Sequence, residues 1–582
     1  MASVIHVTHE AVYQSGGIGT VLQGLITAPS YVGRIERTIL LGPLSDSESD
    51  QPLGPEGEVI YDSGRGEWAE EAGPALASVE NQYGVRLVYG RRRLGDSAVY
   101  AEVLLVDVGR EPLGLDRFKY HLYEHFELDS QSYEGIWEYE QYLRLAEPGY
   151  EGVRRLLGPD QYPCFVIAHE FMGMPTVMRV LLEDDPRFAT IFYAHEVATA
   201  RLLVEQSPGY DLMFYNALKT ARAAGMYMHE VFGPQDGYYK HALIKEAWRC
   251  NAVLAVGDWV VEELRFIGRE FAGADIERVY NGVPTEQITL ADKHEARRKL
   301  QVYAESLLHF RPDLVFTHVA RLVPSKGLWR DLLVLQHLDG LLQRQGRTAV
   351  FIVLATEIGR RDSGSVEKMV EAYEWPLVHC EGYPDLSEGE LEFDLLVRKF
   401  NGRARAVKIL FVNQFGWNRA NCGPAMSADM GFVDLRRGSD VEFGQSIYEP
   451  FGIAQVESLA FGTISVVSDV CGCIGYVEHS AGRGQVRGLI QGAYTHLEKP
   501  LDLAAVMQLG AASRRQVELG QGRQLATLLA DCLPQTLQQA QSLLERGAEV
   551  ASAMSWEKVV RDGFLPALER IARSGGKKWR NF

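Results

Sequence analysis

The sequence lacks the features that would place it in a membrane or on a nucleic acid. It has no apolar run of the roughly 18 residues that a membrane-spanning helix needs. Basic residues are in the minority, since 59 Lys and Arg against 77 Asp and Glu leave a net charge of −18. Phosphate backbones and anionic lipids repel such a chain, so we expect neither nucleic acid nor a membrane as a partner. One locally basic pocket for a phosphate ligand remains compatible with this balance.

Cysteines are also few and follow no pattern. There are seven among 582 residues, an odd number, and they are scattered. The opening residues MASVIHVTHE lack the basic-then-apolar pattern of a signal peptide, so we expect a cytoplasmic protein with reduced thiols. Cys471 and Cys473 are one residue apart, but no second Cys/His pair at zinc-like spacing accompanies them, and we expect no metal site.

The chain does contain the alternation that is typical of α/β proteins. Its length allows two or three domains, and 46% hydrophobic residues is ordinary for a globular protein. Buried, β-rich runs separated by helical patterns occur at 3–9, 164–170, 190–196, 314–321, 349–356, 408–415 and 463–470. Such runs predict parallel sheets. A charged stretch without strand character, 291–314, indicates a domain boundary near residues 285–310. The stretches 44–74 and 416–440 are expected to be surface loops or insertions, and the C-terminal part is expected to be helical.

Two glutamates stand eight positions apart in SIYEPFGIAQVESLAFG, residues 446–462, which is otherwise mostly apolar. Pro450 disfavours helix at Glu449, and the pattern after Gly452 predicts a buried helix that Gly462 closes. Glu449 then lies in the approach loop and Glu457 about two turns further on. Two acids there can simply complement the helix dipole. They can equally bind ligand hydroxyl groups.

A pair of cations follows another predicted strand. The turn ARLVPSKGL, residues 320–328, carries Arg321 and Lys326. Two cations there suit a diphosphate that gains charge as it leaves, because one contact at ~4 Å is worth roughly 4 kcal/mol at an effective dielectric near 20. The alternative is a solvated basic turn.

Histidines and glycines follow the strands of the first series. His169 and His195 each end a predicted strand and precede a glutamate; one such histidine is usually structural, but two in corresponding loops are less easily dismissed. SGGIGT, residues 15–20, brings Gly16 and Gly17 to a helix start, where N–H groups can approach an anion. This is not a GxGxxG motif, and glycine-rich turns after a first strand are common. VYNGV, residues 279–283, holds Asn281 in what is usually just a turn.

Together these groups suit a nucleoside-diphosphate sugar, and their motifs resemble those of retaining GT-B glycosyltransferases, above all glycogen and starch synthases. Glu449 through Glu457 is similar to that family's E-x7-E segment, and Arg321-x4-Lys326-Gly327 to its basic donor motif. Three further stretches resemble family segments, the second being similar to animal and fungal glycogen synthases: AHEFMGMP (168–175), ATIFYAHEVATARLL (189–203) and MSWEKVV (554–560).

The resemblance implies an α/β fold of GT-B type, with two Rossmann-like domains facing a cleft. The acceptor-side domain is expected at residues 1–300 and the nucleotide-sugar-binding domain at 301–550. A helix at 551–582 is expected to return to the first domain.

The resemblance also implies an activity and its partners. The chain is expected to be a hexosyltransferase of the glycogen/starch synthase type. It would move glucose from UDP-glucose or ADP-glucose to the non-reducing end of an α-1,4-glucan, with no metal or other cofactor. The oligomeric state stays open, a homo-oligomer included.

The resemblance assigns roles to the residues of the motifs. Arg321 and Lys326 would stabilise the leaving diphosphate, and Glu449 would bind the sugar hydroxyls. His169 would contact the sugar from the first domain. The other expected donor-binding residues are Gly16, Gly17, His195, Arg201, Asn281, Gly452, Ile453 and Glu457, the last on the ribose.

One position departs from the family, since Gln14 stands where a Lys or Arg usually precedes the two glycines. Three alternatives stay open. The acceptor could be a small sugar or a sugar phosphate. The chain could be a non-catalytic glucan- or nucleotide-binding relative, for which Gln14 is the only support. It could also be a sugar-nucleotide epimerase, although the chain is long for one.

Overall fold

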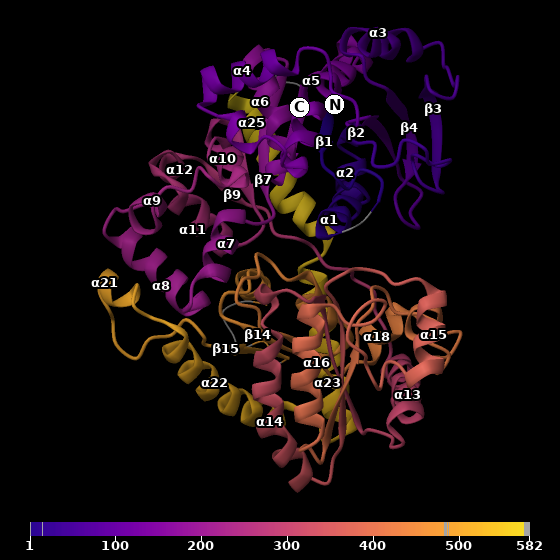
Figure 1. The fold of residues 1–582 in the computed structure, drawn as a ribbon, viewed down its shortest axis with the longest axis vertical. Helices are drawn as coiled ribbons and strands as arrows, with labels where there is room; N and C mark the ends of the chain where they lie inside the picture. The colour runs from indigo at the N-terminus through magenta and orange to yellow at the C-terminus, as the bar shows by residue number, and fades with distance from the viewer. Residues whose placement is uncertain (1, 14–15, 482–485, 487, 575–582) are drawn as a thin grey trace. The chain divides into compact units, whose positions relative to one another are not determined.

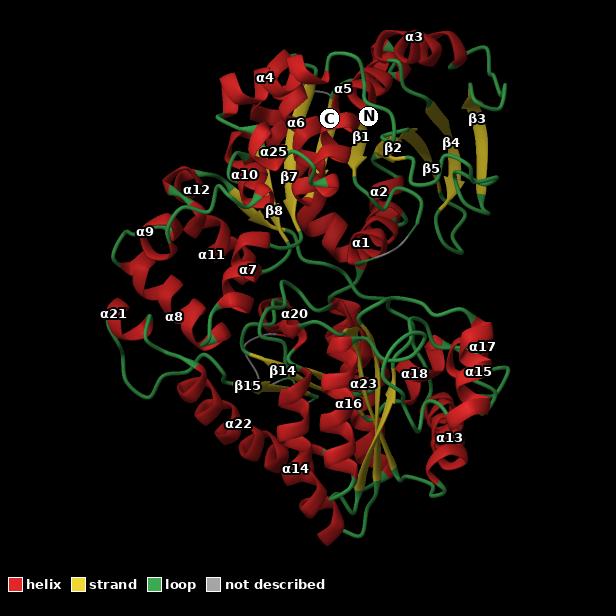
Figure 2. Cartoon of the chain, viewed as in Figure 1, coloured by secondary structure: helices red, strands yellow, loops and turns green. Residues whose placement is uncertain are grey.

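The structure is a computed structural model that describes residues 2–13, 16–481, 486 and 488–574. Contacts divide the chain into two compact units, each built on its own sheet (Figures 1 and 2). The first unit comprises the described residues of Met1–Ala200, Ala221–Gly282 and Trp556–Phe582, and the second those of Arg201–Thr220 and Val283–Ser555. The units therefore interleave along the chain. The sequence led us to expect domains at 1–300 and 301–550, with 551–582 returning to the first. The C-terminal segment does group with the first unit, whereas Arg201–Thr220 groups with the second.

The first unit contains a mostly parallel sheet. Its strands are β1 (Ala2–Val7), β2 (Ile35–Pro43), β3 (Gly57–Asp62), β4 (Leu87–Arg93), β5 (Tyr100–Val106), β6 (Cys164–His169), β7 (Phe188–Ala194), β8 (Ala252–Ala255) and β9 (Ile276–Arg278). Within the described residues these nine strands have the order β3-β4-β5-β2-β1-β6-β7-β8-β9. Only the β3–β4 and β4–β5 pairs are antiparallel. The predicted strands at 3–9, 164–170 and 190–196 are confirmed as β1, β6 and β7. The expected loop 44–74 is partly wrong, because it contains edge strand β3.

Helices pack against this sheet and precede or follow its strands. They are α1 (Gly17–Ile26), α2 (Pro29–Val32), α3 (Gly73–Tyr83), α4 (Leu115–Phe126), α5 (Trp137–Leu156), α6 (Glu170–Glu183), α9 (Met228–Phe232), α10 (Tyr239–Ile244), α11 (Asp258–Ile267), α12 (Arg269–Gly273), α24 (Trp556–Val559) and α25 (Leu565–Ser574). The last two come from the far end of the chain. A Cβ on Gly24 would lie 2.1 Å from the Trp556 indole, and one on Gly282 would lie 2.6 Å from the same residue. These glycines thus let the C-terminal segment pack closely on the first unit.

The second unit contains a fully parallel sheet. Its strands are β10 (Leu314–Arg321), β11 (Ala349–Thr356), β12 (Val407–Val412), β13 (Val441–Gly444), β14 (Ile464–Ser468) and β15 (Leu489–Gly492). Their order within the described residues is β12-β11-β10-β13-β14-β15. The four strands predicted in this part are confirmed as β10, β11, β12 and β14. Side chains alternate between two buried cores, for example Phe316 and Phe351 in one and Val315 and Ile352 in the other, as expected of a parallel sheet covered on both faces.

Helices cover both faces of the second sheet. They are α13 (Leu290–Leu308), α14 (Leu328–Arg344), α15 (Ser363–Tyr373), α16 (Glu388–Asn401), α17 (Arg419–Cys422), α18 (Phe432–Gly438), α19 (Ile453–Glu457), α20 (Cys473–Ala481), α21 (Leu503–Val506), α22 (Ala511–Cys532) and α23 (Leu537–Ala553). Helix α13 accounts for the charged stretch 291–314. Helices α17 and α18 lie within 416–440, so this stretch, expected to be a surface loop or an insertion, contains regular structure. Helices α14 and α22 run side by side (Figure 1).

A buried ion cluster joins the segment Arg201–Thr220 to the rest of the second unit. This segment includes most of α7 (Ala198–Gln206) and of α8 (Tyr210–Ala223). Arg330 of α14 donates to both carboxylate oxygens of Asp211, at 2.7 and 2.8 Å, and to Glu518 at 3.1 Å. Its guanidinium also stacks on Tyr494, 3.9 Å from the ring centroid. Because the Arg330 and Asp211 side chains are fully buried, separating them would leave an uncompensated charge.

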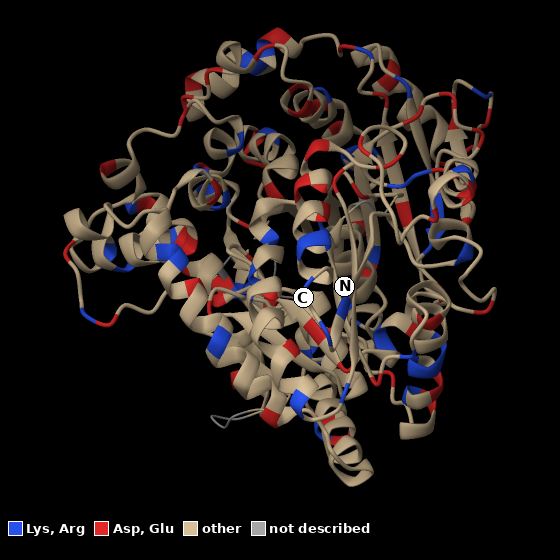
Figure 3. Cartoon of the chain, turned by 60° about the horizontal axis from the view of Figure 1, so that its bottom comes forward, with Lys and Arg blue, Asp and Glu red and all other residues tan. Residues whose placement is uncertain are grey.

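The charged side chains do not separate by sign. Figure 3 shows Lys and Arg interspersed with Asp and Glu along both units. Among the residues that the structure describes, no helix is long and apolar enough to cross a bilayer.

Candidate functional site

In the second unit the predicted basic turn lies against the loop that carries Glu449. β10 ends at Arg321, and a 3-10 turn, Pro324–Lys326, follows it. Gly327 has a φ of +62°, and a Cβ there would lie 2.4 Å from the Gln445 carbonyl oxygen. The Ile447 N–H donates to the Ser325 carbonyl at 2.8 Å. Glycine at this position therefore allows the turn after β10 to pack directly on the loop after β13.

This packing brings two predicted catalytic residues together. Lys326 Nζ lies 2.7 Å from Glu449 Oε2, and Ser446 Oγ donates to the same oxygen at 3.3 Å. Glu449 is only 8% exposed. A positive and a negative group are thus held at the carboxyl ends of adjacent parallel strands, where ligands of open α/β sheets bind.

The segment after Glu449 folds largely as predicted. Glu449 is not helical, Gly452 caps α19 with a φ of +88°, and Gly462 has a φ of +67°. The helix itself is short, because α19 covers Ile453–Glu457 and a 3-10 turn covers Ser458–Phe461. The N–H of Ile453 is among the first of the helix, which have no acceptor within it. Gly452 and Ile453 therefore lie where backbone donors could meet a ligand.

Arg436, which sequence reasoning missed, accompanies Glu457. Its Nε lies 3.5 Å from Glu457, and its Nη1 donates to Glu442 at 3.0 Å. Burial raises the pKa of the Glu457 carboxyl, the nearby Arg436 charge opposes that shift and Glu442 adds to it. The only sequence signal for Arg436 was its basic character within 416–440, which we expected to be an insertion.

Arg321 differs from Lys326 in its surroundings. Its side chain is exposed and makes no hydrogen bond or ion pair with another described residue. It lies at the end of β10, five positions before Lys326. An exposed guanidinium without an ion-pair partner can bind an anionic ligand.

In the first unit the two predicted histidines form one cluster with a third. His169 Nδ1 lies 2.8 Å from His195 Nε2, and His169 Nε2 lies 2.8 Å from His6 Nδ1. His169 is fully buried and both of its ring nitrogens are taken. The expected direct contact of His169 with the sugar does not fit this arrangement, in which it holds His195. His6 could have been noticed as a polar residue inside an apolar strand.

The glycine loop carries an acid that the sequence reading also missed. Glu10 accepts the N–H of Gly19 in the first turn of α1, and a Cβ on Gly16 would lie 2.7 Å from Glu10 Oε1. Gly17 begins α1 and has open space at its Cβ position. The Glu10 carboxylate thus already accepts a hydrogen bond from one of the backbone N–H groups that we expected to bind an anion. Gln14 lies outside the described residues.

The two remaining predicted residues lie at the edges of their units. Asn281 follows β9, is 5% exposed, and its Oδ1 has no hydrogen-bond partner among the described residues. Arg201 is half-buried on α7, in the second unit. Their roles stay predictions.

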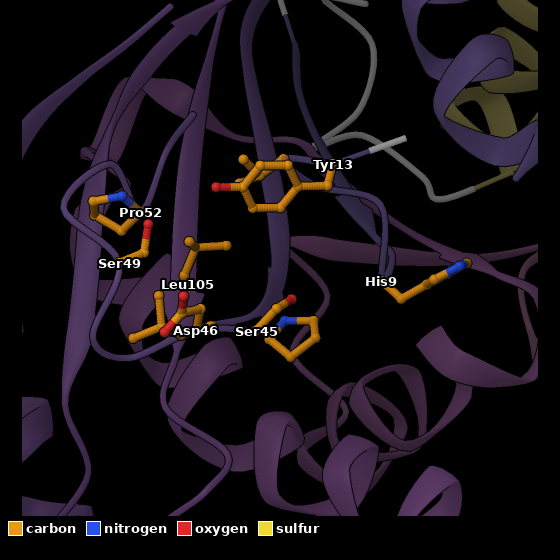
Figure 4. A pocket seen from close by; sticks show the side chains of 10 residues that line it. His9, Tyr13, Ser45, Asp46, Ser49, Pro52 and Leu105 are labelled. Carbon is orange, nitrogen blue, oxygen red and sulfur yellow. The ribbon is translucent and has the colours of Figure 1, made fainter. Parts of the chain in front are cut away.

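Two cavities lie near the ends of strands, one in each unit. One, of about 10 Å³, lies at the ends of β1 and β2, where Tyr13, Ser49 and Pro52 surround Leu105 (Figure 4). It is too small for a sugar ring, since one water needs about as much. The other, of about 520 Å³, is lined by α8 and the ends of β14 and β15, including Lys219 and Asp469. No predicted site residue lines either cavity.

One group of side chains has the composition of a metal site. His121, Glu124 and His125 lie on α4, and both histidines are 3.6 Å from Glu124 Oε2. All three side chains are more than 40% exposed, as in ordinary surface ion pairs. The geometry alone assigns no metal there, and the expectation of a metal-free reaction stays a prediction.

Comparisons with known proteins bear on the fold. No family model and no curated protein matches the sequence. Among solved structures, the catalytic domain of starch synthase IV from Arabidopsis thaliana, bound to ADP and acarbose, has a TM-score of 0.51 at 14% identity and covers 99% of this chain and 100% of its own. An α,α-trehalose-phosphate synthase (UDP-forming) from Burkholderia vietnamiensis has a TM-score of 0.50 at 14% identity, with 99% of both chains covered. The Burkholderia xenovorans synthase in complex with glucose-6-phosphate has a TM-score of 0.50 at 11% identity, covering 98% of this chain and 100% of its own.

These likenesses span nearly the whole chain and concern its architecture. None of the three is an animal or fungal glycogen synthase, so the closeness to that group stays a prediction. With two parallel-sheet α/β units and neighbours of this kind, the chain has the GT-B fold.

Proposed function

We propose that the chain is a retaining glycosyltransferase that moves glucose from a nucleoside-diphosphate glucose to an α-glucan. The observation that carries the proposal is the Lys326–Glu449 pair, 2.7 Å apart at the carboxyl ends of parallel strands. Arg321 lies five positions before Lys326, at the end of β10. Two cations and a carboxylate in one place match the charges of a sugar diphosphate. The GT-B fold supports the proposal at the level of architecture.

In the proposed reaction the bond from the sugar C1 to the diphosphate breaks, and an acceptor hydroxyl attacks C1 from the same face. Arg321 and Lys326 stabilise the negative charge of the departing diphosphate, which takes up the acceptor proton. Glu449 binds the sugar hydroxyls and balances positive charge at C1. N–H groups near Gly452 and Ile453 hold further hydroxyls. Glu457 binds the ribose, with Arg436 orienting it.

A sugar-phosphate acceptor is the second candidate. The Burkholderia xenovorans synthase of similar fold is in complex with glucose-6-phosphate, whereas the starch synthase is bound to acarbose. The donor residues described above serve either acceptor equally, so the structure of the second unit does not choose between them.

The test measures release of nucleoside diphosphate from UDP-glucose and ADP-glucose. Each donor is incubated with glycogen, with glucose 6-phosphate, or alone. Release that depends on glycogen supports the glucan acceptor and names the donor. Release with glucose 6-phosphate alone supports the second candidate. Donor binding without release under any condition would contradict a transferase.

A further inference from the structure

A continuous line of hydrogen bonds crosses the first sheet through three histidines. His195 Nε2 meets His169 Nδ1 at 2.8 Å, and His169 Nε2 meets His6 Nδ1 at 2.8 Å. His6 Nε2 meets the Tyr31 hydroxyl at 3.1 Å, which meets Thr38 Oγ1 at 3.0 Å. The residues belong to neighbouring strands: Thr38 to β2, His6 to β1, His169 to β6, and His195 follows β7.

The three imidazoles are neutral. Burial lowers the pKa of His6 and of His195 to about 3, and lowers that of His169 well below its usual value. The neighbouring imidazoles add to the shifts of His6 and His169, because two adjacent cations would repel. A neutral imidazole has one N–H and one bare nitrogen. Every ring in the line must therefore donate in the same direction.

The groups at the two ends of the line determine the direction of its hydrogen bonds. At the inner end, the Tyr31 and Thr38 hydroxyls can each donate or accept, so they suit either direction. At the outer end, His195 Nδ1 is buried and has no hydrogen-bond partner among the described residues. A buried N–H without an acceptor is rarer and costlier than a bare acceptor atom. The favoured arrangement leaves His195 Nδ1 bare and puts the proton of each ring on Nε2.

We propose that His6 and Tyr31 are positioning residues that fix His169 and His195 in the Nε2–H tautomer, which leaves His195 Nδ1 as a bare hydrogen-bond acceptor at the outer end of the line. The tautomer part stands on the first unit alone. A link to the reaction, through the fixed orientation of the His195 ring, rests on the proposed transferase function.

The first experiment reads the tautomers directly. Full-length protein labelled with 15N and 13C at histidine is studied by NMR, and His6, His169 and His195 are assigned by substitution. We expect the Nε2–H form for all three in the unsubstituted protein. In Tyr31→Phe the His6 Nε2–H loses its acceptor. The Nε2–H tautomers then leave the His6 N–H without a partner, and the Nδ1–H tautomers leave that of His195 without one, so both should be populated. An Nδ1–H form of His195 in the unsubstituted protein, or unchanged tautomers in Tyr31→Phe, would overturn the proposal.

A matched pair of substitutions separates positioning from packing. The Asn amide oxygen at position 6 can accept from His169 Nε2–H as the bare His6 Nδ1 does, whereas Phe at that position cannot. We expect His6→Asn to keep the Nε2–H form of His169 and His195, and His6→Phe to mix the two tautomers. If both variants mix them equally while remaining folded, His6 acts by packing and the proposal fails.

Kinetics then test the link to the reaction. In Tyr31→Phe we expect kcat/KM for the sugar donor to fall about tenfold, the effect of one neutral hydrogen bond. Unchanged kcat/KM together with mixed tautomers would overturn the link to the reaction. A protein with Nε2–H tautomers but no transferase activity would instead contradict the proposed function and leave the tautomer assignment standing, so the two failures are distinguishable.

Discussion

At the scale of single residues, the two units differ in their ionisable side chains: one contains an ion pair, and the other contains buried neutral histidines. Lys326 and Glu449 pair at 2.7 Å at a strand end where both keep some exposure, of 21% and 10% for their side chains. The three histidines of the first unit are buried and kept neutral instead. Lys326 or Glu449 can exchange its partner for a ligand, whereas the hydrogen bonds between the buried histidines fix the orientation of their rings.

Replacing Lys326 tests the first arrangement. We expect Lys326→Ala to lower kcat by about 100-fold or more, because a preorganised cation beside a leaving group is worth that much. The protein should stay folded, but the free energy of unfolding should fall by about 3 kcal/mol, because the buried Glu449 is left without its cation. The measurements are diphosphate release and urea unfolding. Lys368→Ala, which removes an exposed cation of α15, is the control and should retain full activity. Near-full activity of Lys326→Ala would refute its assigned role.

The buried histidines predict a loss of stability in acid. Their folded pKa values lie below the unfolded value of 6.5, so the unfolded chain binds more protons as pH falls. The histidines therefore do not lower the free energy of unfolding above pH 6.5, and they lower it increasingly as pH falls toward 3. His6 or His195 alone should cost about 2 kcal/mol between pH 6.5 and pH 5, measured by urea unfolding at both values.

Two variants check the origin of this pH dependence. His6→Asn should give a shallower fall in stability with decreasing pH, because one buried titrating ring is gone. Substituting the exposed His496 by Ala should leave the fall unchanged. Equal pH dependence in all three proteins would show that other groups cause it.

At the scale of elements, the proposed donor site depends on how closely two loops approach. The turn after β10 and the loop after β13 touch because position 327 has no side chain. Strand β13 is short and was not predicted, yet it pairs with β10 and β14 and so brings Glu449 beside Lys326. The sequence predicted a role for each motif separately, whereas the contact between them depends on this strand order.

Gly327→Ala separates the close approach from the backbone conformation. A Cβ at 327 would combine a φ of +62° with a 2.4 Å contact to Gln445. Gly346 is a matched control, because its φ is +65° but no atom lies within 4 Å of its Cβ position. We expect Gly346→Ala to cost about 1 kcal/mol and to retain activity. Gly327→Ala should cost more and lower kcat at least tenfold through displacement of Lys326; equal effects in the two variants would contradict this.

At the scale of the whole molecule, neither unit is one continuous piece of chain. The C-terminal segment completes the core of the first unit, where Val560, Phe564 and Leu568 are fully buried. The segment Arg201–Thr220 joins the second unit through Asp211 and Arg330. Each core therefore depends on residues that are remote in sequence.

Phe564→Ala tests that dependence. Removing a buried phenylalanine should cost about 3–5 kcal/mol. Because each unit has its own core, amide hydrogen exchange should accelerate in the sheet of the first unit and stay unchanged in β10 to β15. Leu537→Ala, at a side chain that is 69% exposed, should alter neither. Uniform acceleration in both sheets would show that the units unfold as one.

The sequence by itself determined much of the local structure. Apolar runs predicted seven strands, and Pro450 and Gly462 bounded the segment that carries Glu449 and Glu457. The anionic ligand that the cation pair suggested stays a prediction. These follow from backbone propensity and burial over a few neighbouring residues.

Only the tertiary structure decided which groups meet. Lys326 and Glu449 are 123 residues apart, and His6 and His169 are 163 apart. Arg436 reaches Glu457 from a stretch that we expected to be a loop. Such contacts depend on strand order and on chain returns between distant segments. Local periodicity carries no information about either, because it is the packing of the assembled sheets that selects them.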